Sequence, residues 1–161
     1  MAVARKSWRE KLEQDEGLPK VVPTPKKMQK AFGGGTMLIA RPRDVEALVR
    51  KVRKGRLATV NQIRARLAQD AGADTTCPMT TGIFLRIVAE VAAEDLAAGK
   101  TRVAPFWRVL RERGALNPKL PGGVEAQSHR LRAEGHRIER GRGKAPPRVA
   151  DYETRLADLD R

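Results

Sequence analysis

Cys77, the single thiol of the chain, is the first side chain that could do chemistry, as a nucleophile that accepts a group from a substrate. It precedes Pro78 at the predicted start of a helix, a position that favours the reactive thiolate. The two histidines that could serve as its base, His129 and His136, are both distant in sequence. A transferase that uses Cys77 is therefore one hypothesis, but a free cysteine at such a turn is more often a small, partly buried packing residue.

The sequence contains no pattern for other catalytic chemistry. One cysteine and two histidines give no zinc-ligand spacing. Gly33-Gly34-Gly35 lacks the Lys-Ser/Thr pair that follows the glycines of a phosphate-binding P-loop. The scattered carboxylates form no pair that spacing can place. We therefore expect no metal, no cofactor and no enzymatic activity.

Charge is the strongest global feature of the 161 residues. Lys and Arg number 33 against 19 Asp and Glu, which gives a net charge of +14 and a pI near 10.9. The net charge is +9 over 1–56, zero over 57–103, +6 over 104–144 and −1 over 145–161. A chain this basic is attracted to polyanions and releases their counterions on binding. We expect nucleic acid, most of all double-stranded DNA, to be the partner.

The remaining composition favours one small domain with tails. Hydrophobic residues make up 40% of the chain but aromatic residues only 4%, so we expect an aliphatic core. No apolar run is long enough to span a membrane, and the first residues have no apolar stretch of the secretory type. A single cysteine forms no internal disulfide. These features predict a monomer in the cytoplasm, at the nucleoid if the source is bacterial.

The elements that would position a binding site are mainly helical. Asp44 is expected to cap a helix that runs to about Lys54, with Val45, Leu48, Val49 and Val52 on its core face and Gly55 after its end. Before it, residues 1–35 read as a basic arm without a regular core element, apart from a helical turn over 7–13 that carries a docked Trp8. Residues 36–40 are predicted to be a short strand.

Two further helices form a predicted helix-turn-helix. Thr59 and Gln62 form a capping box for a helix that ends at Gly72, with Val60, Ile63, Leu67 and Ala71 on one face. Pro78 suits the first turn of a longer helix that ends at Gly99 and buries Ile83, Ile87, Val91 and Leu96. A short turn containing glycine joins the two helices, which together with the charge favours nucleic-acid binding.

The second half of the chain is predicted to hold a small β wing and a tail. Val103, Val109 and Leu110 are plausible strand positions, and a fourth helix covers 124–134. Residues 137–147 are basic and rich in Gly and Pro, so we expect a mobile strap, followed by a short helix with Tyr152, Leu156 and Leu159 on one face. The predicted fold is thus a mainly α winged helix-turn-helix over 36–138, between the arm (1–35) and a basic linker with a short helix (139–161).

The predicted nucleic-acid contacts fall into three groups. The densest run of cations follows the first long helix, hydroxyls gather at the start of the third helix, and further cations decorate that helix and the wing. The hydroxyls have ordinary helix capping as an equal alternative. The full set is Arg50, Lys51, Arg53, Lys54, Arg56, Asn61, Thr76, Thr80, Thr81, Arg86, Arg111, Arg113 and Lys119.

This order of elements and motifs resembles a known family. Gly55-x-x-x-Thr59, the two helices, Pro105-x-x-Arg108-Val109 and Glu134-Gly135 resemble the DNA-binding domain of alkylguanine-DNA alkyltransferases, and most of all the alkyltransferase-like proteins. The resemblance covers about 44–138. It implies a winged helix-turn-helix whose second helix lies in the minor groove, and a pocket that receives a flipped, damaged guanine.

The reactive motif of that family, Pro-Cys-His-Arg-Val, departs from this sequence. Phe106 and Trp107 stand where the resemblance implies the nucleophile and its base, so alkyl transfer is unavailable at this site. The vestigial pocket is expected to comprise Pro105, Phe106, Trp107 and Arg108. We expect one of the two aromatic side chains, Phe106, to point inward or to line the pocket and the other to be available to stack on a base, while Arg108 is expected to hold the following loop.

Two further departures concern base flipping. Thr59-Val60-Asn61 stands where the resemblance implies a Thr-Tyr-Gly segment, and no arginine precedes Arg86 in the region of the intercalating arginine. Met79 or Phe84 could replace that arginine as a wedge. The leading hypothesis is a non-enzymatic protein of the alkyltransferase-like type that binds alkylated or distorted duplex DNA without repair. The alternatives are an RNA- or ribosome-associated basic factor and the transferase that uses Cys77.

Overall fold

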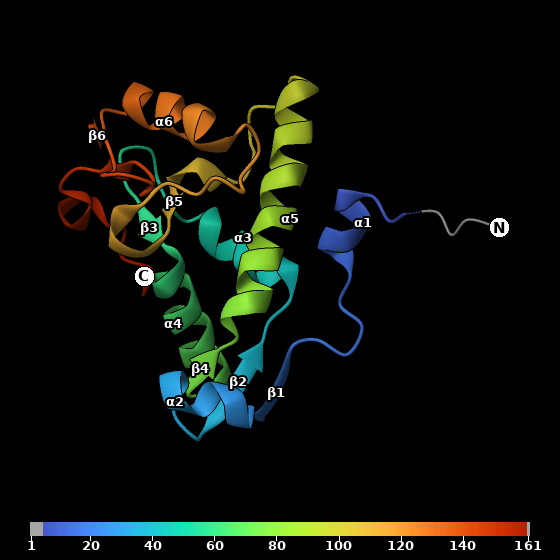
Figure 1. The fold of residues 1–161 in the computed structure, drawn as a ribbon. Coiled ribbons are helices and arrows are strands. Elements are labelled where there is room, and N and C mark those ends of the chain that lie inside the picture. The colour runs from blue at the N-terminus through green and yellow to red at the C-terminus, as the bar shows by residue number, and fades with distance from the viewer. Residues whose placement is uncertain (1–4, 161) are drawn as a thin grey trace.

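A computed structural model describes residues 5–160 and shows a mainly helical protein with small sheets, as predicted (Figure 1). The six α-helices in this part of the chain are α1 (Trp8–Glu13), α2 (Gln29–Phe32), α3 (Pro42–Val49), α4 (Val60–Ala71), α5 (Pro78–Ala97) and α6 (Gly123–Ala133). The long α5 packs against α3 and α1, and α6 lies toward its C-terminal end (Figure 1). No helix within 5–160 is long and apolar enough to cross a membrane.

Helix α3 buries the predicted face but has different ends. Pro42 occupies the first turn, and Asp44 lies three residues inside the capping position, where its Oδ2 accepts a hydrogen bond of 2.9 Å from the backbone N–H of Arg41. The helix ends at Val49, because the chain then forms tighter turns that close through Lys51 and Val52. The predicted Asp44 cap and the end at Lys54 are therefore wrong, and the cations of 50–56 lie on a turn and loop.

Helix α4 follows its prediction closely. Thr59 and Gln62 form the capping box, with hydrogen bonds of 3.0 and 3.1 Å, and Gly72 ends the helix with a φ of +68°. Ile63 and Leu67 are buried as predicted, whereas Ala71 is exposed.

Helix α5 starts and ends as predicted but buries a different face. Ile83 is 56% exposed, and the core contacts come from Leu85, Val88, Ala89 and Ala92 besides the predicted Ile87 and Val91. The prediction assumed a single core face. Because α3 and α1 both pack on α5, two of its faces are covered, while Met79 and Ile83 on its first turns stay exposed.

Three small sheets complete the fold of the described residues. Their strands are β1 (Lys20–Pro23), β2 (Thr36–Ile39), β3 (Ala58–Thr59), β4 (Thr75–Thr76), β5 (Val109–Leu110), β6 (Ile138–Glu139) and β7 (Arg148–Val149). The first sheet has the order β1-β2-β4, the second pairs β3 with β5 in parallel, and the third is the β6–β7 hairpin.

The N-terminal segment contains more structure than its composition predicts. Strand β1 pairs antiparallel with β2, with Val21 opposite Leu38, so the arm contains a regular strand that was not predicted, although the side chains of this strand are mostly exposed. Proline is tolerated because β1 is an edge strand and Pro23 is its last residue. Helix α1 forms behind a capping box at Ser7, and Trp8 docks against the core as predicted. Residues 1–4 and 161 lie outside the described part.

The C-terminal segment is also more ordered than predicted. The expected strap over 137–147 is framed by the β6–β7 hairpin, and the last element is a 3₁₀ turn over Tyr152–Arg155 rather than an α-helix. The backbone N–H of Leu57 donates to Arg155 at 2.9 Å, and that of Ala157 donates to Leu57 at 2.7 Å. These bonds hold the tail beside β3.

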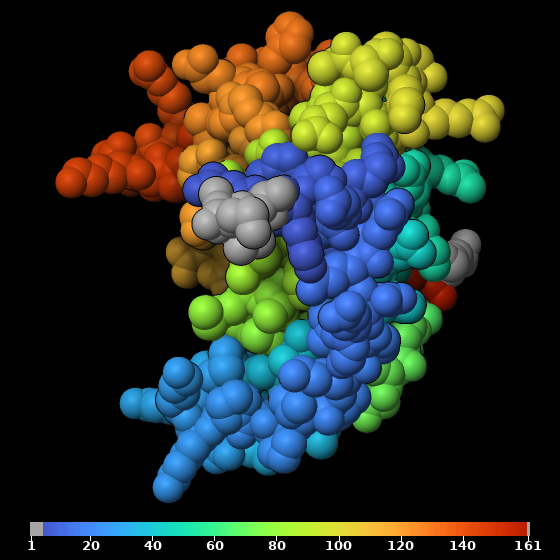
Figure 2. All heavy atoms as spheres, turned by 90° about the vertical axis from the view of Figure 1, so that its right-hand side faces the viewer, coloured from blue at the N-terminus to red at the C-terminus, as the bar shows by residue number. Residues whose placement is uncertain are grey.

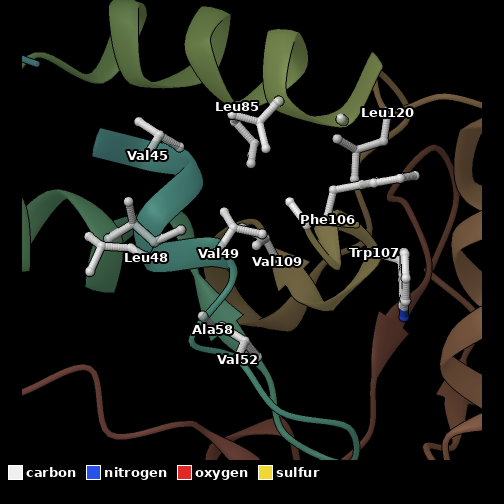
Figure 3. Packing of buried hydrophobic residues seen from close by; sticks show 14 of the residues in the cluster. Val45, Leu48, Val49, Val52, Ala58, Leu85, Phe106, Trp107, Val109 and Leu120 are labelled. Carbon is white, nitrogen blue, oxygen red and sulfur yellow. The ribbon is translucent and has the colours of Figure 1, made fainter. Parts of the chain in front are cut away.

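The core is aliphatic, as the composition predicts. It joins α3 and α5 to the segment around Phe106, with Val45, Val49, Leu85 and Val109 all buried (Figure 3). This core fixes the position of the segment after Val109 relative to α5.

Candidate nucleic-acid interface

The Pro105–Val109 motif is a 3₁₀ turn, Phe106–Arg108, followed by β5. The rings of Phe106 and Trp107 meet edge to face with centroids 5.4 Å apart, and the two residues are only 4% and 8% exposed. The expectation that one aromatic points outward is wrong, because a 3₁₀ turn does not alternate its side chains as a strand does. Phe106 points inward as predicted, and neither ring is free to stack on a base.

Glu134, at the end of α6, holds this motif. Its carboxylate accepts hydrogen bonds of 2.8 Å from the indole Nε1 of Trp107 and from Nε and Nη2 of Arg108. Burial alone would raise the pKa of Glu134, but these hydrogen bonds outweigh burial and lower the pKa. Arg108 also donates to the carbonyl of Val52 at 2.7 Å. Arg108 therefore has a structural role, as predicted. It links the end of α6 to the turn that follows α3 and does not hold the loop that follows Arg108 itself.

Gln127 on α6 positions the segment after β5. Its Nε2 donates to the carbonyls of Trp107 and Val109, each at 3.1 Å, and its Oε1 accepts from the backbone N–H of Asn117 at 2.8 Å. No local sequence pattern predicts this role of Gln127, because the groups that it bonds lie far away in sequence.

An open groove of about 770 Å³ lies between the start of α4, the first half of α5 and residues 111–120. We call it the central groove. In the described part of the chain, its charged lining consists of four cations and one carboxylate: Arg64, Arg86, Arg111, Lys119 and Glu112. Pro105, Phe106, Trp107 and Arg108 are absent from this lining, so the groove does not open onto the Pro105–Val109 motif.

The structure brings some of the predicted contact residues together in the central groove and leaves others outside. Asn61, Arg86, Arg111 and Lys119 line it. The cations of the loop after α3 are absent from the lining, and Lys54 instead borders a hollow beside Trp107 and α6. Arg113 is exposed in a tight turn with a φ of +58°.

The predicted hydroxyls lie at the start of α5 but are engaged with backbone carbonyls. Thr76 donates to the carbonyl of Arg64 at 2.7 Å, and Thr81 donates to that of Cys77 at 2.7 Å. Both are buried, while Thr80 is partly exposed and donates to Cys77 at 3.4 Å. These residues hold the turn between α4 and α5 together.

Arg64 is the groove residue that the sequence reasoning missed. Its Nε donates to the carbonyl of Thr76 at 2.9 Å, and its guanidinium lies 5.1 Å from the ring centroid of Phe32. Burial lowers the pKa of Arg64, and no carboxylate within 5–160 forms an ion pair with it. Arg64 is therefore a cation in a fixed position that has no ion-pair partner among the described residues. The sequence feature that could have identified Arg64 is its position one turn after Asn61 on the predicted helix.

The outer face of α5 presents apolar and small side chains beside the central groove. Met79 is 69% exposed and Ile83 is 56% exposed, with the exposed Gly82 between them. Of the two predicted wedges, Met79 stands free, whereas Phe84 is partly buried against the core. Large exposed apolar side chains on a basic surface are typical of a contact site.

Cys77 is a buried capping residue. It is 8% exposed, it precedes the first turn of α5, and its N–H donates to the carbonyl of Leu38 at 2.9 Å. The central groove is lined by Pro78 and Met79 but not by Cys77.

A comparison with solved structures supports the fold, whereas two other comparisons found no match. No protein-family model matches the chain, and no curated protein matches it. The structure is similar to that of S. pombe Atl1 in complex with damaged DNA containing O6-carboxymethylguanine, with a TM-score of 0.52 and 18% identity over 73% of this chain and 94% of that chain. Atl1 is an alkyltransferase-like protein, so the resemblance inferred from the sequence motifs is supported at the level of the fold.

Proposed function

We propose that this chain is a non-enzymatic DNA-binding protein of the alkyltransferase-like type, which binds alkylated or distorted duplex DNA without repairing it. The observation that carries the proposal is the central groove, a basic hollow beside the exposed apolar face of α5. The fold shared with Atl1, which was crystallised with damaged DNA, supports the same function.

In this proposal α4 and α5 act as a helix-turn-helix, and residues 111–120 act as the wing. The first turns of α5 face the DNA, since Met79, Gly82 and Ile83 present a shallow surface without acidic side chains. Such a surface can approach base edges in the minor groove while Arg64, Arg111 and Lys119 contact phosphates. The fixed position of Arg64 reduces the entropy lost when it binds a phosphate.

The central groove has room for a flipped nucleotide. Its volume of about 770 Å³ is within the usual range for small-molecule pockets. Asn61 and Asn117 supply amide groups in its lining. Met79 stands at its edge, where an unbranched apolar side chain can fill the gap that an extruded base leaves in the stack.

Loss of repair follows from the side chains themselves. Phe106 and Trp107 offer neither a nucleophile nor a base, and both are packed in the core. Cys77 is covered and lies outside the groove lining, so a bound alkylguanine would not reach its sulfur. We further propose that the protein acts as a monomer in the cytoplasm, at the nucleoid of a bacterial cell.

Equilibrium binding to matched duplexes with and without one O6-alkylguanine, over a series of salt concentrations, tests the proposal. We expect tighter binding to the modified duplex at every salt concentration and a steep salt dependence for both. Equal affinity for the two duplexes would contradict lesion recognition. Preference for a structured RNA in competition would instead favour the RNA- or ribosome-associated factor.

A further inference from the structure

A second groove lies on the other side of α5, between this helix and the N-terminal segment. We call it the lateral groove. Its volume is about 690 Å³, and within residues 5–160 every charged side chain that lines it is a cation: Arg5, Lys6, Lys11 and Arg86. Figure 2 shows the N-terminal segment lying across this face of the molecule, over the green of α5. The composition of a proline-rich arm did not predict a formed groove here.

Helix α1 is attached firmly enough to hold these cations in place. Leu12 is 5% exposed in the core, and Arg9 forms an ion pair of 2.7 Å with Asp95 of α5. Trp8 packs against the core, with Lys11 and Arg86 lying 4.4 and 5.5 Å from its ring. The two acidic residues of the helix, Glu10 and Glu13, do not line the groove. The helix therefore presents its positive charges toward α5.

The two grooves share a wall. Ile83 and Arg86 line both of them, so the outer face of α5 forms a ridge with a basic groove on each side. A duplex presents a matching arrangement, because each of its grooves is bounded by two phosphate backbones. A ridge inserted between the backbones would place one strand in each basic groove.

We infer that the lateral groove binds the phosphate backbone of one DNA strand while the central groove binds that of the other strand. This inference rests on the proposed function and extends it to residues 5–18. Lys6, Lys11 and Arg86 contact the phosphates, and the deoxyribose packs on Ile83 and the edge of Trp8. An acidic peptide would satisfy the charges of one groove, but the shared ridge favours one ligand that occupies both.

The test compares two double variants with the wild-type protein. Lys6→Gln/Lys11→Gln removes two charges from the lateral groove, and Arg102→Gln/Arg132→Gln removes two from exposed positions outside both grooves, one after α5 and one on α6. Affinity for one duplex is measured over a salt series. We expect the first variant to lose about tenfold in affinity at 0.1 M salt. The magnitude of its negative slope of log K against log salt should decrease by about 1–2. The control should change both far less.

Arg5→Gln/Lys6→Gln is the second variant, because it leaves the contact of Lys11 with Trp8 intact. It should give a similar loss, with an unchanged thermal unfolding midpoint. If both variants match the wild-type affinity and slope while the wild-type protein binds the duplex, the inference is overturned and the proposed function stands. If the wild-type protein does not bind duplex DNA, the proposed function fails, and the inference fails with it.

Discussion

The Pro105–Val109 motif and the outer face of α5 differ in how their polar groups are satisfied. In the motif, one carboxylate of Glu134 accepts bonds from both Trp107 and Arg108, and both aromatic rings are buried. On α5, exposed apolar side chains stand beside grooves whose cations outnumber their carboxylates. A saturated, buried network supports the fold, whereas excess positive charge beside exposed apolar surface is available for a ligand. The contrast supports the proposal that the motif stabilises the fold and that the outer face of α5 binds the ligand.

The largest effect is expected from breaking the buried network. Glu134→Ala should lower the free energy of unfolding by about 3 kcal/mol, because it leaves the guanidinium of Arg108 buried without its partner. Urea denaturation measures this change, and Glu125→Ala, at an exposed position of α6, is the matched control. The DNA affinity of the folded fraction should stay unchanged. A large loss of affinity at unchanged stability would contradict the structural role of the motif.

The converse is expected for the central groove. Arg111→Gln/Lys119→Gln should weaken duplex binding about tenfold at 0.1 M salt, because two exposed phosphate contacts are removed. The free energy of unfolding should change by less than about 0.5 kcal/mol. The measurements are equilibrium titration and urea denaturation. Unchanged affinity with an unchanged salt slope would show that DNA does not lie in this groove.

A pH effect on stability is expected from His136, which lies close to the buried network of Glu134 and Arg108. Burial lowers the pKa of His136, and Arg155 and Arg108 lower it further while Glu134 raises it. Its Nε2 is buried without a hydrogen-bond partner within 5–160. Below about pH 6.5 the unfolded chain binds the proton more readily than the folded protein, so stability falls as the pH drops from about 6.5 toward the lowered pKa.

His136→Gln should flatten this fall between pH 7.5 and 5.5, as followed by the urea midpoint. A separate fall below about pH 4.5 should remain, because the pKa of Glu134 is also lowered and its stabilising contacts are lost when it takes up a proton. If the variant loses the same stability over pH 7.5–5.5 as the wild-type protein, His136 is not the titrating group.

The smallest effect should come from the ridge. Met79→Ala should reduce the preference for alkylated over unmodified duplex a few-fold, because a shorter side chain fills the gap left by a flipped base less well. The salt slope should stay the same, since no charge changes. Ile83→Ala is the comparison, as both side chains are exposed and apolar. If the wild-type protein and Met79→Ala prefer the alkylated duplex equally, Met79 does not act as a wedge.

Local signals explain most of what the sequence could predict. The Thr59 capping box, the glycine end of α4 and the proline start of α5 are short-range features, and all three are found. The prediction for α3 was wrong at both ends, because the true cap depends on Pro42 and the backbone of Arg41.

Long-range packing accounts for the rest. The buried faces of α5 depend on α1, which spacing within α5 cannot reveal. Strand β1 forms because it pairs with β2. The 3₁₀ turn at Phe106 is stabilised by hydrogen bonds of its next residue, Trp107, with Gln127 and Glu134. The resemblance, over about 44–138, covers most of the segments that line the central groove, but the fixed position of Arg64 and the lateral groove depend on segments that meet only in the folded chain.

The central claim is that binding persists without alkyl transfer. The most direct measurement is mass spectrometry of both partners after the protein has been saturated with a duplex that carries one O6-alkylguanine. We predict a stable complex in which the protein mass is unchanged and the recovered DNA keeps its alkyl group. A protein heavier by the alkyl group, with the label at Cys77 and normal guanine in the DNA, would contradict the account.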